Sequence, residues 1–303
     1  MSGEFDYIRQ LRQRIPPAPG IVVGPGDDCA VLARPLRSVL ATTDLLQDGV
    51  DFLLGECGVL AAGRKAMAVN LSDIAAMAGV PTAALIGLCL PKLDGMTIAE
   101  GVFDGAKSVA DQFSVPIAGG DTNSWDGPLV ISVTVLGEST NRGPVRRSGA
   151  KPGDWLFVTG PLGGSIHGRH LNPQPRIHEA VRIHEVADLH AMIDISDGLA
   201  ADLGHLCRES GCGALLEADS IPIHVDARNA DSQTALESAL HDGEDFELLF
   251  AVAPADGTRL LHYQPVPGLT LVRIGECTES GLEIRRDGKK QAFIAKGWVH
   301  AMG

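Results

Sequence analysis

The sequence predicts an α/β protein made of two α/β domains, at 1–140 and 141–303. Strand-like and helical runs alternate along the first half, with strands expected at 38–42, 83–90, 115–118 and 129–137 and helices at 61–78 and 97–113. A stretch rich in Gly and Pro at 141–154 interrupts this alternation and marks the domain boundary. A chain of 303 residues with 45% hydrophobic content is long enough to bury a substantial core.

Each expected element has its own local signal. The helix at 97–113 begins with Thr97 and Glu100, the spacing of a capping box, and its apolar residues then follow helical periodicity. The second half predicts a helix at 199–209 that ends at Gly211, and a hairpin that turns at Asp287-Gly288. Further strands are expected there at 155–159, 191–195, 214–217, 246–252, 269–274 and 282–286.

Composition excludes several classes of protein. The net charge of −13, with no cluster of Lys and Arg, argues against a nucleic-acid partner. The N-terminus has no secretory pattern, no apolar run is long enough to span a membrane, and the six cysteines include no C-x-x-C pair. We therefore expect a cytoplasmic protein with no membrane partner.

Aspartate recurs in short segments that contain Gly, Ser or Thr and that read as strand ends or helix starts. These segments are Gly26-Asp27-Asp28, Thr42-Thr43-Asp44, Asn70-Leu71-Ser72-Asp73, Gly119-Gly120-Asp121-Thr122 and Asp194-Ile195-Ser196-Asp197-Gly198. Converging carboxylates repel one another, and a divalent cation relieves that repulsion. Oxygen ligands without supporting His or Cys favour Mg²⁺.

Most of these residues also have a structural interpretation. Asp73 lies in an apolar helical run and is either a metal ligand or a surface acid beside Lys65. Asp28 and Asp44 also suit turns or caps, and Ser196 suits either a helix N-cap or an anion site. Trp298 is either a lid that stacks on a ligand or an anchor for the C-terminal tail.

One glycine-rich segment does not fit a known nucleotide loop. The residues at 160–165, Gly-Pro-Leu-Gly-Gly-Ser, contain neither the Gly-Lys-Ser/Thr of a P-loop nor a G-x-G-x-x-G fingerprint.

Taken together and in this order, the segments resemble the thiamine-monophosphate kinase family. The most specific blocks are N-L-S-D-I-A-A-M, which starts at Asn70, and R-S-G-A-K-P-G-D, which starts at Arg147. Other matching blocks are G-D-D-C-A from Gly26, D-I-S-D-G from Asp194 and G-E-D-F-E-L from Gly243. The resemblance covers nearly the whole chain.

The resemblance implies a homodimer of two-domain subunits of the aminoimidazole ribonucleotide synthetase-like type. It implies that the N-terminal sheets pair across the dimer and that several Mg²⁺ ions hold ATP between the domains. The implied metal ligands are Asp28, Thr42, Thr43, Asp44, Asp73, Asp121, Asp194 and Asp197. The implied ATP contacts are Phe103, Gly120, Asp121, Arg147 and Ser196, and the implied substrate contacts are Asp51, Glu244 and Trp298.

The implied reaction moves the γ-phosphoryl group of ATP onto thiamine monophosphate by direct in-line transfer, with no residue acting as general base. Two departures from the family pattern bear on substrate choice: Asp51 replaces the usual His, and the connection at 168–173 looks shortened. The alternatives are another ATP-dependent enzyme of the same superfamily, a metal-dependent phosphatase, or a metal-binding module without catalysis.

Overall fold

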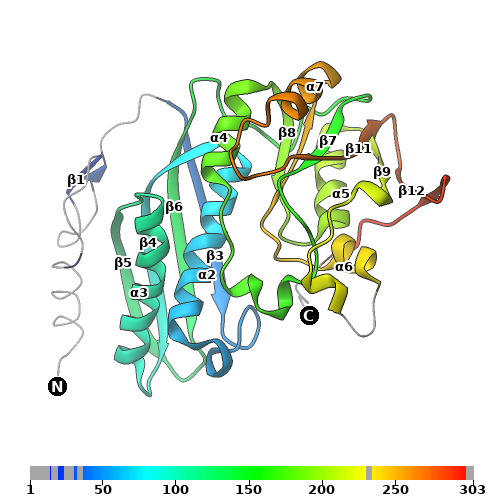
Figure 1. The fold of residues 1–303 in the computed structure, drawn as a ribbon. Coiled ribbons are helices and arrows are strands. Elements are labelled where there is room, and N and C mark those ends of the chain that lie inside the picture. The colour runs from blue at the N-terminus through cyan, green and yellow to red at the C-terminus, as the bar shows by residue number, and fades with distance from the viewer. Residues whose placement is uncertain (1–13, 15–19, 24–30, 33–36, 230–233, 298–303) are drawn as a thin grey trace. The chain divides into compact units, whose positions relative to one another are not determined.

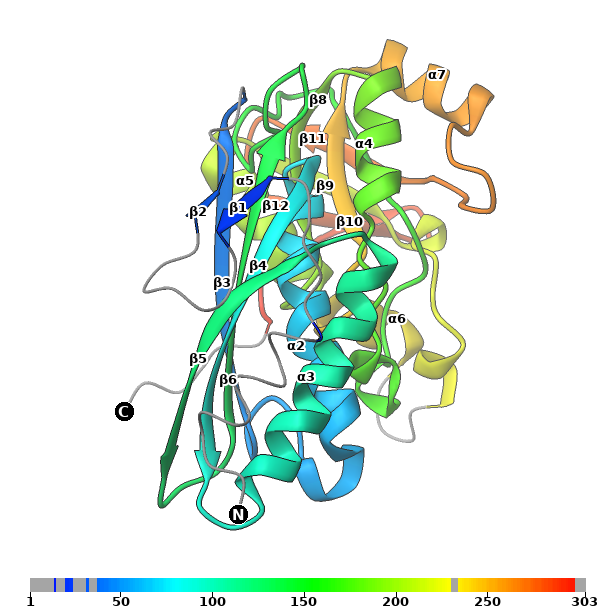
Figure 2. The same ribbon diagram turned by 90° about the vertical axis from the view of Figure 1, so that its left-hand side faces the viewer.

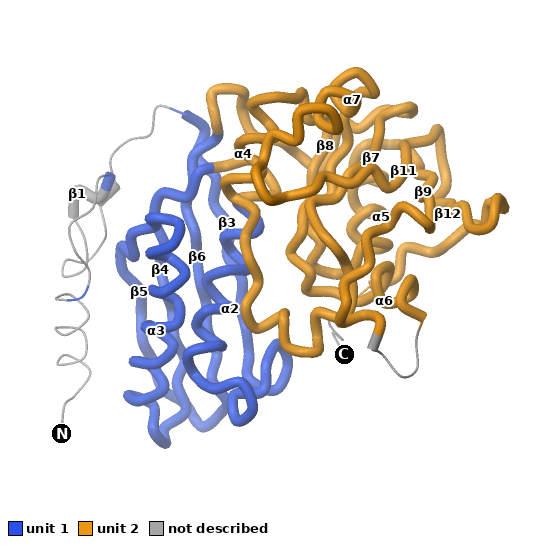
Figure 3. The backbone as a smooth tube through the Cα atoms, in the orientation of Figure 1, with its two compact units in different colours: residues 1–74, 80–139 blue, residues 75–79, 140–303 orange. Residues whose placement is uncertain are grey.

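The chain folds into two compact units that are each described here by themselves. The computed structural model describes residues 14, 20–23, 31–32, 37–229 and 234–297. Unit 1 comprises residues 1–74 and 80–139, and unit 2 comprises residues 75–79 and 140–303 (Figure 3). The chain therefore leaves unit 1 briefly, at the end of one helix, before it returns to form the next strand.

Unit 1 is a four-stranded sheet with two helices on one face (Figure 2). The strand order is β3-β6-β4-β5, in which β3 and β6 are antiparallel and β4 and β5 are parallel. Its elements are β3 (Val39–Gln47), α2 (Leu54–Ala76), β4 (Gly79–Pro91), α3 (Gly95–Gln112), β5 (Ile117–Trp125) and β6 (Val130–Ser139). A short antiparallel pair, β1 (Ile21–Val23) and β2 (Val31–Leu32), precedes them.

Glycines let the two helices of unit 1 approach very closely. A Cβ atom built on Gly63 of α2 would lie 2.0 Å from the carbonyl oxygen of Val102, and one on Gly105 of α3 would lie 2.1 Å from that of Leu60. Neither helix backbone can accommodate a side chain at these points. The close crossing holds α2 in place, and α2 carries Asn70 and Asp73.

Unit 2 contains a seven-stranded mixed sheet in the order β13-β12-β9-β11-β7-β10-β8 (Figure 1). Its strands are β7 (Trp155–Val158), β8 (Leu189–Asp194), β9 (Gly213–Glu217), β10 (Leu248–Val252), β11 (Val272–Thr278), β12 (Leu282–Arg286) and β13 (Lys289–Ala292). Its α-helices are α4 (Ile177–Val186), α5 (Leu199–Ser210), α6 (Ala235–His241) and α7 (Pro254–Tyr263). Short 3-10 turns are η1 (Ser165–His167), η2 (Arg169–Leu171), η3 (Ala218–Ser220) and η4 (Asp226–Asn229).

Both faces of this sheet are covered. Leu156 and Val158 of β7 join a core that includes the buried residues of α5 and α6. Because side chains alternate along a strand, Phe157 of β7 faces the other side of the sheet. There its ring stacks on that of Phe250 of β10, with 5.4 Å between the ring centroids. Gly257 of α7 packs against the Phe157 ring. A sheet packed on both faces is a rigid support for the turns at its strand ends.

Several expected elements are confirmed, and some local signals were wrong. The helix at 199–209 and its end at Gly211 are found as α5, and Asp287-Gly288 forms the turn between β12 and β13. The capping box at Thr97 is wrong, because α3 begins earlier and its N-cap is Asp94, whose side chain makes no capping hydrogen bond. Thr42, Thr43 and Asp44 lie inside β3 rather than at a strand end, since β3 pairs with β6 along its whole length.

No helix in the described part of the chain has the length and apolar character needed to cross a membrane.

Replacing Gly105 by Ala tests the close helix crossing. We expect Gly105→Ala to lower the free energy of unfolding by about 1–3 kcal/mol, because the new methyl group overlaps the backbone of Leu60. Gly55→Ala is the matched control: Gly55 also lies in α2 but has no heavy atom within 4 Å of its Cβ position, so Ala should be neutral or stabilising. Equal unfolding free energies for the two variants, measured by urea denaturation, would contradict the crossing.

Candidate functional site

The first group of predicted site residues lies where the middle of β3 faces α2 in unit 1. The hydroxyl of Thr42 donates a 2.5 Å hydrogen bond to the Asp73 carboxylate. The buried Asn70 side chain accepts a hydrogen bond from the Asp44 backbone N–H at 3.1 Å and donates one to the Ala66 carbonyl at 2.9 Å. Asn70 therefore fixes the position of Asp44 relative to the helix that carries Asp73.

Asp44 sits in an unfavourable electrostatic environment. Burial raises the pKa of Asp44 to about 6, and the nearby carboxylates of Asp73 and Asp51 contribute to the rise. The buried Lys65 of α2 donates an ammonium hydrogen bond to the Asp51 carbonyl at 2.6 Å. The carboxylates are thus held together by the fold although their charges repel.

The surface-acid interpretation of Asp73 is not supported. Lys65 is 1% exposed, so it is not a surface partner for an exposed carboxylate. Asp73 is itself only partly exposed and accepts the Thr42 hydroxyl. Asp51, a predicted substrate contact, accepts the Gln47 backbone N–H at 2.7 Å and so closes the turn after β3.

Other predicted residues of unit 1 lie apart from this group. The hydroxyl of Thr43 is on the opposite side of β3, where it bonds the Val133 carbonyl at 3.2 Å and the Thr134 hydroxyl at 3.0 Å. Asp121 is exposed on β5, and the Phe103 side chain is buried on α3. A Cβ on Gly120 would lie 1.9 Å from the Ile86 carbonyl oxygen, so strand pairing alone requires this glycine. Asp28 lies outside the described residues.

The second group of acids lies at the end of β8 and the start of α5 in unit 2. Asp194 and Asp202 are both buried, and the Asp202 carboxylate accepts the Asp197 backbone N–H at 3.0 Å. Burial is the main cause that raises the pKa of Asp202 to about 8, and the carboxylates of Asp194 and Asp197 add to it. Arg147 opposes this rise, which places its positive charge close to the acids.

The structure removes one interpretation of Ser196. The N-cap of α5 is Gly198, with φ of 106°, and no side chain makes a capping hydrogen bond there. Ser196 is therefore not the cap. Its backbone carbonyl instead accepts the Glu244 N–H at 2.7 Å, so a predicted ATP contact and a predicted substrate contact are joined through the backbone.

The C-terminal segment reaches the same turn. A Cβ on Gly297 would lie 2.3 Å from the Asp197 carbonyl oxygen and 2.4 Å from the Ala201 side chain, so only glycine fits there. The Lys296 carbonyl also lies 3.2 Å from Nδ1 of His241. Trp298, the next residue in the sequence, lies outside the described residues.

The chemistry of the two acidic groups suits a divalent cation that is shared with a ligand. Among the residues the structure describes, no three His, Cys, Asp or Glu side chains are arranged to hold a metal ion by themselves. Mg²⁺ commonly binds through one or two carboxylates and completes its shell with water and substrate phosphates. Close carboxylates, among them Asp44 and Asp202 with raised pKa values, fit that mode of binding.

Sequence reasoning missed residues that hold the site in place. Asp202 reads in the sequence as an ordinary acid in the first turn of a helix. In the structure it is buried, and its carboxylate holds the backbone N–H of Asp197.

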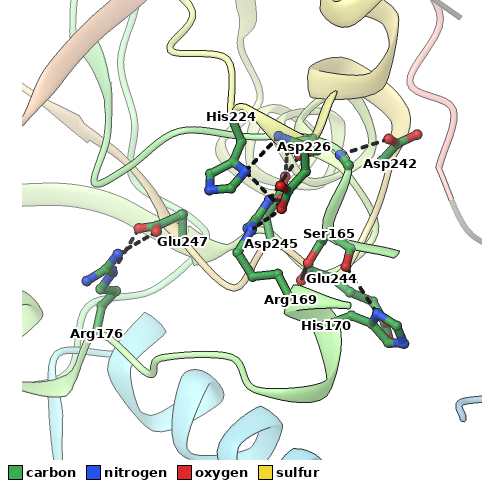
Figure 4. A network of polar contacts seen from close by, with 12 residues as sticks. Ser165, Arg169, His170, Arg176, His224, Asp226, Asp242, Glu244, Asp245 and Glu247 are labelled. Carbon is green, nitrogen blue, oxygen red and sulfur yellow. Dashed lines mark hydrogen bonds and ion pairs between the residues drawn. The ribbon is translucent and has the colours of Figure 1, made fainter. Parts of the chain in front are cut away.

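A polar network also surrounds Glu244 in unit 2 (Figure 4). In it, Arg169 bonds Asp245 at 3.0 Å, and Arg176 bonds both oxygens of Glu247 at 2.9 and 2.5 Å. Arg169 belongs to the connection at 168–173 that looked shortened in the sequence, and Arg176 follows it three residues later.

Family models match both halves of the chain. The AIR synthase related protein N-terminal domain matches residues 26–139, and the corresponding C-terminal domain matches residues 151–287. A thiamine-monophosphate kinase from Rhodopirellula baltica is 42% identical over 98% of this chain and 97% of the relative. The chain belongs to the thiamine-monophosphate kinase family. The thiamine-monophosphate kinase of Escherichia coli K12 is 34% identical, over 98% of each chain.

Solved structures of thiamine-monophosphate kinases share the fold. The enzyme from Stenotrophomonas maltophilia K279a superposes with a TM-score of 0.80 at 33% identity, over 94% of this chain and 95% of that one. A structure described as AaThiL complexed with AMPPCP and TMP has a TM-score of 0.76 at 31% identity, over 99% and 97% of the two chains. The predicted fold class, two domains of the aminoimidazole ribonucleotide synthetase-like type, is confirmed.

Proposed function

We propose that this protein transfers the γ-phosphoryl group of ATP to the phosphate of thiamine monophosphate, which yields thiamine diphosphate and ADP. The observation that supports this most strongly is the similarity to thiamine-monophosphate kinases along the whole chain, including a relative described in complex with AMPPCP and TMP. The acidic groups of both units supply the chemistry that such a transfer needs.

Mg²⁺ is the cofactor that these acids fit. We propose that Asp44 and Asp73 of unit 1 and Asp194 and Asp197 of unit 2 hold magnesium ions, with Asp28, Thr42, Thr43 and Asp121 as further ligands that the family resemblance implies. Bound magnesium would neutralise phosphate oxygens and reduce the repulsion between two anionic substrates. The Thr43 hydroxyl bonds to β6, on the side of β3 opposite to the Asp44 and Asp73 group, so its role as a ligand rests on the family resemblance alone.

The protein's own groups orient the two substrates. We propose that Arg147 and the Ser196 turn contact ATP phosphates, together with Gly120, and that Glu244, Asp51 and Trp298 contact thiamine monophosphate. Phe103 offers ATP little surface, because its side chain is buried. No general base is needed, since the second pKa of a phosphate monoester is about 6 and the acceptor is already ionised at neutral pH.

The substitution Asp73→Asn tests both the reaction and the metal assignment. With γ-labelled ATP, Mg²⁺ and thiamine monophosphate, the wild type should form labelled thiamine diphosphate, whereas Asp73→Asn should lose nearly all turnover and remain folded. Asp111→Asn is the control, because Asp111 is an exposed helix residue paired with Lys107. Label released as inorganic phosphate would indicate a phosphatase instead, and normal turnover by Asp73→Asn would exclude the ligand role.

Trp298 has two possible roles that give different kinetics. If it stacks on the thiamine rings, Trp298→Ala should raise the KM for thiamine monophosphate by a factor that corresponds to about 1 kcal/mol or more, with the KM for ATP little changed. The close approach of Gly297 to the Asp197 turn is compatible with either role. A tail anchor would instead lower thermal stability and leave both KM values nearly unaltered.

We also propose that the protein is a cytoplasmic homodimer. Val39 and Leu45 of β3 and Val80 of β4 are exposed apolar residues of the unit 1 sheet, and exposed apolar groups of this kind suit a protein partner. Sedimentation at micromolar concentration should give about twice the chain mass of 31.8 kDa. A fully active species with the mass of one chain would refute the dimer.

A further inference from the structure

Glu244 has a backbone conformation that is unusual for its residue type. Its φ is 62°, and that of Phe246 is 51°, so two of three consecutive residues lie in the left-handed region although neither is glycine. Such a conformation is strained for residues other than glycine, and it persists only where the surroundings enforce it.

The turn after β8 enforces part of this conformation. The backbone N–H of Glu244 donates to the Ser196 carbonyl at 2.7 Å, and that of Phe246 donates to the Ile195 carbonyl at 2.8 Å. Gly243 lies so close that a Cβ there would be 2.5 Å from the Ser196 carbonyl oxygen. These bonds fix the N–H groups of the segment, whereas the Glu244 carbonyl needs a partner of its own.

Ser165 provides that partner. It is fully buried, and its hydroxyl donates a 2.6 Å hydrogen bond to the Glu244 carbonyl. The Ser165 carbonyl in turn lies 3.0 Å from Nδ1 of His170, so Ser165 bridges Glu244 and His170 (Figure 4). The Glu244 backbone is thereby held from both sides, by Ser196 and by Ser165.

The loop that carries Ser165 is itself fixed. The N–H groups of Gly163 and Gly164 donate to the carboxylates of Asp245 at 2.8 Å and Asp242 at 3.0 Å. Arg169 bonds both the Gly163 carbonyl, at 2.9 Å, and Asp245, at 3.0 Å. A Cβ on Gly163 would lie 2.6 Å from the backbone of α6, and one on Gly164 would lie 2.4 Å from that of η4. The glycines of the 160–165 segment therefore serve close packing, and Ser165 cannot move aside.

We propose that Ser165 is a positioning residue for the thiamine-phosphate substrate. Its hydroxyl holds the Glu244 backbone in the left-handed conformation, which sets the direction of the partly exposed Glu244 carboxylate toward a cationic ligand such as the positively charged ring of thiamine. This inference rests on the proposed function, in which Glu244 contacts thiamine monophosphate.

The role predicts a selective kinetic effect. Without the hydroxyl, the buried carbonyl loses its bond and the Glu244 backbone can relax to ordinary conformations, so its carboxylate is no longer held in one direction. We expect Ser165→Ala to raise the KM for thiamine monophosphate about tenfold and to change the KM for ATP less than about twofold.

Ser238→Ala is the matched control. Ser238 lies in the same unit, is 1% exposed, and has a hydroxyl with no hydrogen-bond partner among the described residues. Ser238→Ala removes a buried hydroxyl, as Ser165→Ala does. The KM values for thiamine monophosphate and for ATP should both stay at wild-type levels in this variant. An equal rise in the KM for thiamine monophosphate in both variants would mean that loss of a buried hydroxyl acts through general loosening and would overturn the positioning role.

A double-mutant cycle completes the test. Because Ser165 acts through the Glu244 carboxylate, Ser165→Ala should add nothing to the KM change caused by Glu244→Gln. Additive effects, or an unchanged KM in Ser165→Ala, would overturn the inference. If Ser165→Ala does not fold, Ser165→Cys replaces it in the test, because its thiol keeps a weak hydrogen-bond donor. Ser165→Cys should show a smaller rise in the KM for thiamine monophosphate. A wild-type KM in Ser165→Cys would also overturn the inference. Failure of the wild type to phosphorylate thiamine monophosphate would instead overturn the proposed function and, with it, this inference.

Discussion

Repulsion between close carboxylates is the constraint on which the site depends. In unit 1 the fold holds Asp44 near Asp73 and Asp51, and in unit 2 it holds Asp202 near Asp194 and Asp197. Folding against such repulsion costs free energy that packing elsewhere must offset. Close packing of this kind is found in the glycine-mediated crossing of α2 and α3 in unit 1 and in the doubly covered sheet of unit 2. We propose that a cation that binds together with the ligand relieves this repulsion.

Backbone geometry connects Ser196, which we propose as an ATP contact, with Glu244, which we propose as a substrate contact. Ser196 and Glu244 belong to different segments, and a hydrogen bond joins the Glu244 N–H to the Ser196 carbonyl. The buried acids Asp245 and Glu247, each held by an arginine, stabilise the segment that Glu244 begins. The strain at Glu244 is tolerated because ion pairs and hydrogen bonds surround it. Precise placement of substrate groups is the main contribution that a phosphoryl-transfer enzyme requires of its protein.

The sequence predicted those features that local signals encode. Helix α5 was expected with its end at Gly211 because glycine adopts the left-handed conformation there, with φ of 68°. Features that depend on the rest of the fold were not predictable. Strand β3 extends through Asp44 because β6 pairs with it from a distant part of the chain. Helix α3 begins at Gly95, so Thr97 lies inside the helix and is not its N-cap. The left-handed Glu244 has no signature in residue type, because the bonds that enforce it come from Ser196 and Ser165.

The acids predicted as ligands differ in how far the fold supports them. Asp44, Asp73, Asp194 and Asp197 lie in groups of close carboxylates, whereas Asp121 stands exposed on β5 and Thr43 turns its hydroxyl to β6. Alternation along β3 separates Thr43 from Thr42 and Asp44, and a contiguous sequence motif does not reveal this by itself.

The aspartate carboxylates themselves offer the most direct measurement of the central claim, that they hold the metal ions of the nucleotide. In protein labelled with ¹³C at the aspartate carboxyl groups, Mn²⁺ added with a non-hydrolysable ATP analogue broadens the NMR signals of nearby carboxylates. The account predicts that the signals of Asp44, Asp73, Asp194 and Asp197 disappear, while those of the exposed Asp111 and Asp188 remain sharp. Sharp signals from Asp73 and Asp194 at saturating Mn²⁺ and analogue would contradict it.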